Sequence, residues 1–136
     1  MILLMDQPLL RIARQTGRLR EISEMYQTGL GFEVLGGFDD HDGYDGVFLG
    51  IPGGQYHLEF ISKWGHDPSP PTSDENLMIF YHPNRAEWES ACSRMAAAGF
   101  VRVGSGNPYW DRKGRTFEDL EGFRVTLCND SWPPRN

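Results

Sequence analysis

Apolar residues recur with helical spacing in two separate stretches of the chain. Leu19, Ile22, Met25 and Tyr26 follow an i, i+3, i+6, i+7 pattern, which predicts an amphipathic helix that ends at Gly29 or Gly31. A second helix is predicted to begin at Asn84, where Asn84 and Glu87 form a capping box. Its apolar face is made of Trp88, Ala91, Cys92, Met95 and Ala98.

Shorter apolar segments bounded by glycine, proline and aspartate predict eight strands. These are Leu10–Gln15, Phe32–Leu35, Tyr44–Ile51, Gln55–Lys63, Leu77–His82, Phe100–Val103, Arg115–Glu118 and Phe123–Cys128. Asp39–Gly43 is predicted to be a polar turn, and the segment 107–111 a loop with two aromatic residues.

The order of these elements repeats. A helix followed by Leu30-Gly31-Phe32 and a strand returns as a helix followed by Ala98-Gly99-Phe100 and a strand, 68 positions later. Such a duplication predicts an α+β fold of two tandem βαβββ modules, forming a curved, open, barrel-like mixed sheet with helices on the outside. We expect one domain over residues 1–136: module one about 9–63, a linker about 64–76, module two about 77–129 and a frayed tail 130–136.

Composition narrows the range of partners. The 136 residues are 39% hydrophobic and carry a net charge of −6, which is ordinary for a globular protein and argues against nucleic acid or an anionic membrane as a partner. Cys92 and Cys128 lack metal-motif spacing, and reduced thiols are expected. The sequence shows no signal peptide and no apolar run long enough for a membrane span, so we expect a cytoplasmic protein.

Alternation along the strands separates two faces of the predicted sheet. In the fourth strand Tyr56, Leu58 and Phe60 should lie under a helix, which leaves His57 and Glu59 on the opposite face. The last strand should likewise bury Phe123, Val125 and Leu127, and turn Arg124 and Thr126 towards the cavity. Polar side chains on a curved sheet face indicate a ligand site.

Three motifs, in this order and spacing, resemble the vicinal oxygen chelate superfamily of glyoxalase I, bleomycin-resistance proteins and extradiol dioxygenases. They are Leu19…Met25-Tyr26…Leu30-Gly31-Phe32-Glu33-Val34, then His57-Leu58-Glu59-Phe60, then Thr116-Phe117-Glu118-Asp119-Leu120-Glu121-Gly122-Phe123-Arg124. The resemblance covers about residues 9–129. It implies paired modules, a small-molecule ligand or substrate, and a homodimer.

The resemblance also implies where a divalent metal would be held. The first-strand ligand position falls on Arg11, the fourth-strand position on Glu59, the next near Leu77 or Ile79, and the last on Thr126. Only Glu59 matches, and arginine has no acceptor atom to offer a metal. We therefore expect no resident metal cofactor, and a guanidinium of Arg11 that pairs with Glu59 where the metal would lie.

The candidate ligand-binding residues are Arg11, His57, Glu59, Tyr109, Trp110 and Arg124, with Glu59 as the catalytic candidate if the protein is an enzyme. Tyr109 and Trp110 suit the rim of a pocket, or else seal the core or a dimer interface. The two arginines favour a carboxylate or phosphonate ligand, whereas the acidic surface favours a cationic drug.

The preferred function is small-molecule binding without the standard metal site. One alternative is a metal-dependent lyase, isomerase or dioxygenase that uses Glu59 and His57 with a ligand from a partner chain. Another is a resistance protein that sequesters a drug without chemistry.

Overall fold

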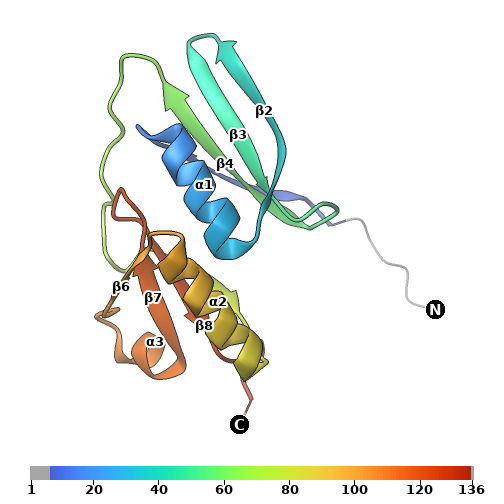
Figure 1. The fold of residues 1–136 in the computed structure, drawn as a ribbon, viewed down its shortest axis with the longest axis vertical. Coiled ribbons are helices and arrows are strands. Elements are labelled where there is room, and N and C mark those ends of the chain that lie inside the picture. The colour runs from blue at the N-terminus through green and yellow to red at the C-terminus, as the bar shows by residue number, and fades with distance from the viewer. Residues whose placement is uncertain (1–6, 136) are drawn as a thin grey trace, which may run out of the picture.

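The computed structural model describes residues 7–135, which form three helices and eight strands. The first module contains β1 (Leu10–Gln15), α1 (Leu19–Leu30), β2 (Glu33–His41), β3 (Tyr44–Gly50) and β4 (Tyr56–Lys63). The second contains β5 (Leu77–Tyr81), α2 (Arg85–Ala97), β6 (Val101–Val103), α3 (Pro108–Lys113), β7 (Gly114–Glu118) and β8 (Arg124–Cys128). The α+β architecture of two βαβββ modules is confirmed (Figure 1).

Each module builds its own four-stranded mixed sheet, in the order β1-β4-β3-β2 in the first and β5-β8-β7-β6 in the second. The first strand of each module pairs in parallel with the last, and the remaining pairs are antiparallel. The equivalent strands β1 and β5 therefore both lie at sheet edges. This shared order is the structural form of the repeat in the sequence.

The core forms where α1 and α2 pack against each other and against their sheets. Tyr26 of α1 lies between Phe60 of β4 and Phe100, with ring centroids 4.8 and 5.2 Å away. Gly29 allows the close approach of the helices, because a Cβ there would lie 2.9 Å from the sulfur of Met95. The two modules consequently share one core.

Three predictions about local structure are wrong. The segment 39–43 is not a polar turn throughout, because β2 continues to His41 and Asp42-Gly43 alone make the turn. The segment 107–111 is not a loop: Asn107 caps α3 by accepting from the Tyr109 N–H. The tail is not frayed up to residue 135, because Asp130 accepts hydrogen bonds from the backbone N–H groups of Ser131 and Arg135.

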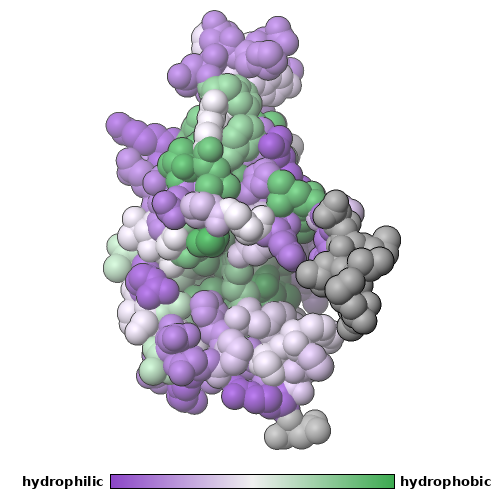
Figure 2. Space-filling model, turned by 90° about the vertical axis from the view of Figure 1, so that its right-hand side faces the viewer, coloured by the Kyte–Doolittle hydropathy of each residue, from purple (hydrophilic) through white to green (hydrophobic). Residues whose placement is uncertain are grey.

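The surface carries apolar side chains beside polar ones, as Figure 2 shows for the side that faces right in Figure 1. On β1 and just before it, Leu9, Leu10 and Ile12 are 60%, 55% and 41% exposed. None of the helices in the described part of the chain is long and apolar enough to cross a membrane. Exposed apolar residues at a sheet edge are typical of a contact surface.

We predict that Met95→Ala destabilises the protein by about 2–5 kcal/mol, because Met95 is fully buried where the two helices meet and its removal leaves a cavity. Urea denaturation followed by circular dichroism measures the change. Ser93→Ala, at an exposed position of the same helix, is the matched control and should change stability by less than about 0.5 kcal/mol. Equal stability of the two variants would contradict the shared core.

Candidate functional site

Arg11, His57 and Glu59 lie together on one face of the first module's sheet. β1 and β4 pair in parallel, with Arg11 opposite His57. The Arg11 Nε–H donates to Nε2 of His57 at 2.9 Å, and Nη1 of Arg11 lies 4.0 Å from Oε2 of Glu59. The Arg11 guanidinium also stacks on Phe48 of β3, 4.4 Å from the ring centroid. We name this group the Arg11 cluster.

The Arg11 cluster is accessible to solvent, and neighbouring side chains hold the Arg11 guanidinium in place. The Arg11 side chain is 49% exposed and the Glu59 side chain 14%. Nε2 of His57 accepts the hydrogen bond from Arg11, which fixes how the two side chains lie against each other. The aromatic ring, the imidazole and the carboxylate together orient a guanidinium whose terminal nitrogens can meet a ligand.

The residues at the superfamily's metal positions do not fit a divalent ion. Arg11 is a cation without an acceptor atom, and its Nε–H already uses Nε2, one of the two ring nitrogens through which His57 could bind a metal. Within residues 7–135, no three histidine, cysteine or acidic side chains converge in a geometry that could hold a metal. These residues therefore do not supply the ligands that a metal ion would need to act there as a Lewis acid.

The equivalent face of the second module is closed. Thr126, expected to face a cavity, is instead fully buried, and its Oγ1 lies 2.7 Å from Oγ1 of Thr116. The short helix α3 packs on β7 and β8. The two hydroxyls satisfy each other, so they are unavailable to a ligand.

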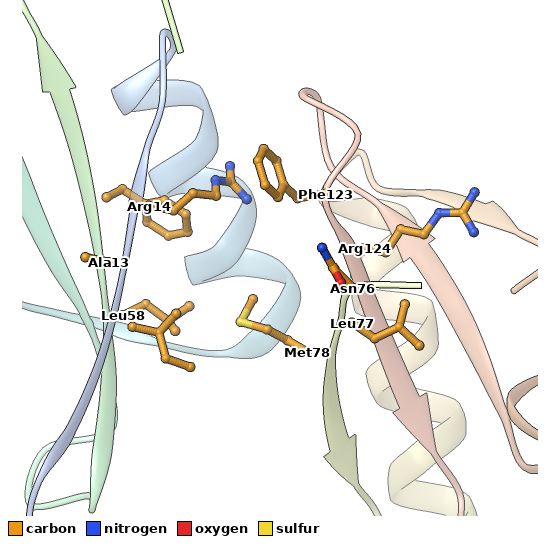
Figure 3. Close-up of a pocket in the computed structure, with 10 residues that line it drawn as sticks. Ala13, Arg14, Leu58, Asn76, Leu77, Met78, Phe123 and Arg124 are labelled. Carbon is orange, nitrogen blue, oxygen red and sulfur yellow. The ribbon is translucent and has the colours of Figure 1, made fainter. Parts of the chain in front are cut away.

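Arg124 is placed in a different site from Arg11. Its Nε and Nη2 donate to Glu118 at 3.0 and 2.9 Å, and its Nη1 donates to the carbonyl of Gly104. The stem of Arg124 lines a cavity of about 250 Å³ between β1 and β5, whereas its guanidinium points away from the cavity (Figure 3). Because its donors are already used, Arg124 has little capacity left to bind a ligand.

A second arginine, Arg14, joins the two modules at the end of this cavity. Its Nη1 donates to Asp119 at 2.7 Å and its Nη2 to Glu121 at 3.2 Å, both in the turn before β8. Its guanidinium lies 3.9 Å from the ring centroid of Phe123, and Figure 3 shows these two side chains pointing towards each other. We call the cavity of about 250 Å³, which Arg14 also lines, the Arg14 cavity.

Tyr26 completes this junction by donating its hydroxyl hydrogen to Asp119 at 2.8 Å. Burial, and then the negative charge of Asp119, raise the pKa of Tyr26, so it stays protonated at any physiological pH. The Asp119 side chain is completely buried, and Arg14 supplies the positive charge that burial requires. Sequence analysis missed this contact, since the two residues are 105 positions apart.

Tyr109 and Trp110 lie on α3, with their ring centroids 4.9 Å apart and nearly perpendicular. No hydrogen bond, ion pair or ring contact within the described chain joins them to the Arg11 cluster. The candidate residues of the sequence therefore form three separate groups: the Arg11 cluster, Arg124 at the Arg14 cavity, and the aromatic pair of α3.

The fold is that of the vicinal oxygen chelate superfamily. Leishmania major glyoxalase I, which is 17% identical, superposes with a TM-score of 0.70 over 91% of this chain and 87% of its own. The fosfomycin resistance protein FosX of Mesorhizobium loti, at 11% identity, gives a TM-score of 0.68 over 95% and 96%. At these identities the likeness concerns the fold alone.

Within that superfamily the chain belongs to the YycE-like family. Residues 10–61 match the YycE-like N-terminal domain and residues 75–129 the YycE-like C-terminal domain. The uncharacterized protein YycE of Bacillus subtilis is 42% identical over 120 residues, 88% of this chain and 86% of YycE. A crystal structure of B. subtilis YycE, described as a protein of unknown function and candidate glyoxalase or fosfomycin resistance protein, gives a TM-score of 0.83 at 41% identity, over 90% and 89% of the chains.

We predict that Arg14→Met destabilises the protein by about 3–5 kcal/mol, because it leaves the buried Asp119 carboxylate without its cation. Chemical denaturation measures the loss. The double variant Arg14→Met/Asp119→Asn removes the uncompensated charge and should recover part of the lost stability. A strictly additive double variant would show that the two side chains do not interact.

Proposed function

We propose that the protein binds a small anionic molecule at the Arg11 cluster, without a metal ion. The observation that carries this proposal is the placement of Arg11: a half-exposed guanidinium, beside Phe48, His57 and Glu59, at a position where the resemblance to the superfamily implies a metal ligand. A fixed cation can take over one role of a metal, which is to bind and orient negatively charged oxygens.

The chemistry of the cluster favours a carboxylate or phosphonate group. Nε of Arg11 is used by His57, while the terminal nitrogens are free to donate to two oxygens of one ligand. Glu59, at 4.0 Å, is beyond hydrogen-bonding distance and leaves those donors open. Phe48 and Phe38, with ring centroids 5.9 Å apart, offer apolar surface beside the charge for the remainder of the ligand.

The comparisons support a small molecule in general terms. The similar structures include a glyoxalase I and a fosfomycin resistance protein, and the B. subtilis relative is described as a candidate for either group. We take fosfomycin, a phosphonate, as the first probe. Because the donor set does not fit a metal, binding without turnover is favoured over metal-dependent lyase, isomerase or dioxygenase chemistry, and Glu59 is assigned to holding Arg11.

Tyr109 and Trp110 would become part of the ligand site only in an assembly of two chains. Tyr109 is 36% exposed and, with Trp110, is separate from the Arg11 cluster of its own chain. We propose a homodimer, supported by the exposed apolar residues Leu9, Leu10 and Ile12 at a sheet edge. In such a dimer, aromatic residues of a second copy could cover a ligand on the open face.

We predict that fosfomycin binds the protein after treatment with EDTA, and that Arg11→Met weakens binding about tenfold or more through the loss of a charge-assisted hydrogen bond. Isothermal titration calorimetry measures the affinity, and phosphorus NMR should show fosfomycin unchanged after incubation.

The matched control is Arg20→Met, which removes an 82% exposed arginine from α1 and should leave affinity unchanged. Absence of binding, equal binding by Arg11→Met, or binding that appears only after Mn²⁺ is added would each contradict the proposal.

A further inference from the structure

A second cavity lies between the modules and shares no lining residue with the Arg11 cluster or the Arg14 cavity. It has a volume of about 390 Å³ and is lined from module one by the end of α1 and the start of β4, and from module two by β5 and α2. Its aromatic and charged lining residues are Phe32, Tyr56, Phe80, Tyr81, His82 and Arg94. We call it the aromatic cavity.

Three rings meet in the wall of the aromatic cavity: Phe32 from the link between α1 and β2, Tyr56 from β4 and Phe80 from β5. Phe32, Tyr56 and Phe80 have centroid distances of 6.2, 6.1 and 6.2 Å, so each ring contacts the other two. Tyr56 is 36% exposed and Phe32 only 6%, so Tyr56 is the accessible ring and Phe32 backs it from the core. Aromatic walls bind planar rings through large contact areas and edge-to-face geometry.

The polar side of the aromatic cavity carries positive charge. Arg94 is exposed, and within residues 7–135 its side chain takes part in no ion pair or hydrogen bond. His82 lies in the same wall. Burial, and then the charge of Arg94, lower the pKa of His82, so at neutral pH its imidazole is uncharged and can still donate one hydrogen bond.

We propose that the aromatic cavity is a second ligand site, which takes a planar aromatic molecule bearing a carboxylate or sulfonate. The ring of the ligand packs on Phe32, Tyr56 and Phe80, and its acidic group accepts hydrogen bonds from Arg94. This assignment is independent of the Arg11 cluster.

The charge of the ligand follows from the contrast between this wall and the rest of the protein. The whole chain has a net charge of −6, so its overall field repels anions and only a local cation can bind one. Arg94 provides such a cation, whereas Glu87 is the acidic residue that acts on His82 from the first turn of α2. A cationic aromatic ligand would meet the same Arg94 and be repelled.

The test uses 2-naphthoate and its neutral amide, 2-naphthamide, as probes on the full chain. Isothermal titration calorimetry should show naphthoate binding, with naphthamide weaker by about tenfold or more, the effect of losing a charge-assisted hydrogen bond. Arg94→Met should remove the difference between the two probes, and Phe80→Leu should weaken both. Chemical-shift changes in a nitrogen–proton NMR spectrum should include Arg94, His82 and Tyr81.

Arg85→Met, which removes an exposed arginine from the same helix, is the matched control and should not change naphthoate binding. Because a carboxylate can also bind at the Arg11 cluster, the titration is repeated with Arg11→Met: the naphthoate-induced shifts of Arg94, His82 and Tyr81 should persist in it, which separates this site from the one proposed for fosfomycin. Naphthoate binding that is absent, equal to naphthamide binding, or insensitive to Arg94→Met would overturn the proposal. So would chemical-shift changes that depend on protein concentration alone, since a second copy would then fill the cavity.

Discussion

The buried contact between Arg14 and Asp119 is the constraint on which the arrangement of the two modules depends. A carboxylate with no exposed surface needs a cation and hydrogen bonds, and Arg14 and Tyr26 supply them from the other half of the chain. Charge, aromatic stacking on Phe123 and helix packing act at one junction. Two modules of similar topology are thereby fixed as one body rather than as two repeats on a linker.

The same strand serves the junction and the proposed ligand site. Alternate residues of β1 point to opposite faces of the sheet, so Arg14 faces the second module and Arg11 faces the open side. The junction holds β1 in position, and pairing with β4 brings Arg11 to His57 and Glu59. The two modules have diverged at the equivalent face: the first exposes charge, whereas in the second Thr116 and Thr126 are buried.

The sequence predicted the structural features that depend on local periodicity and on the repeated order of elements. The strands β1 and β4 and the cap at Asn84 follow from alternation and the duplicated order. The proximity of Arg11 to Glu59 was implied by the family resemblance, which placed both residues at metal-ligand positions. It missed the contacts that only the packed chain creates, as between Arg14 and Asp119. The helix α3 was missed because six residues are too few for a periodic pattern. Because α3 packs on β7 and β8, a prediction without this helix could not anticipate the burial of Thr126 on β8.

The claim at the centre of this account is that Arg11 takes the place of a metal ion at the open face. Elemental analysis by mass spectrometry, on protein equilibrated with Mn²⁺ and Zn²⁺ and then desalted, tests it most directly. We expect no stoichiometric ion, because Arg11 brings a positive charge to a metal-ligand position and its Nε–H already uses Nε2 of His57. About one ion per chain, lost in Glu59→Gln, would contradict the account and show that donors converge there after all.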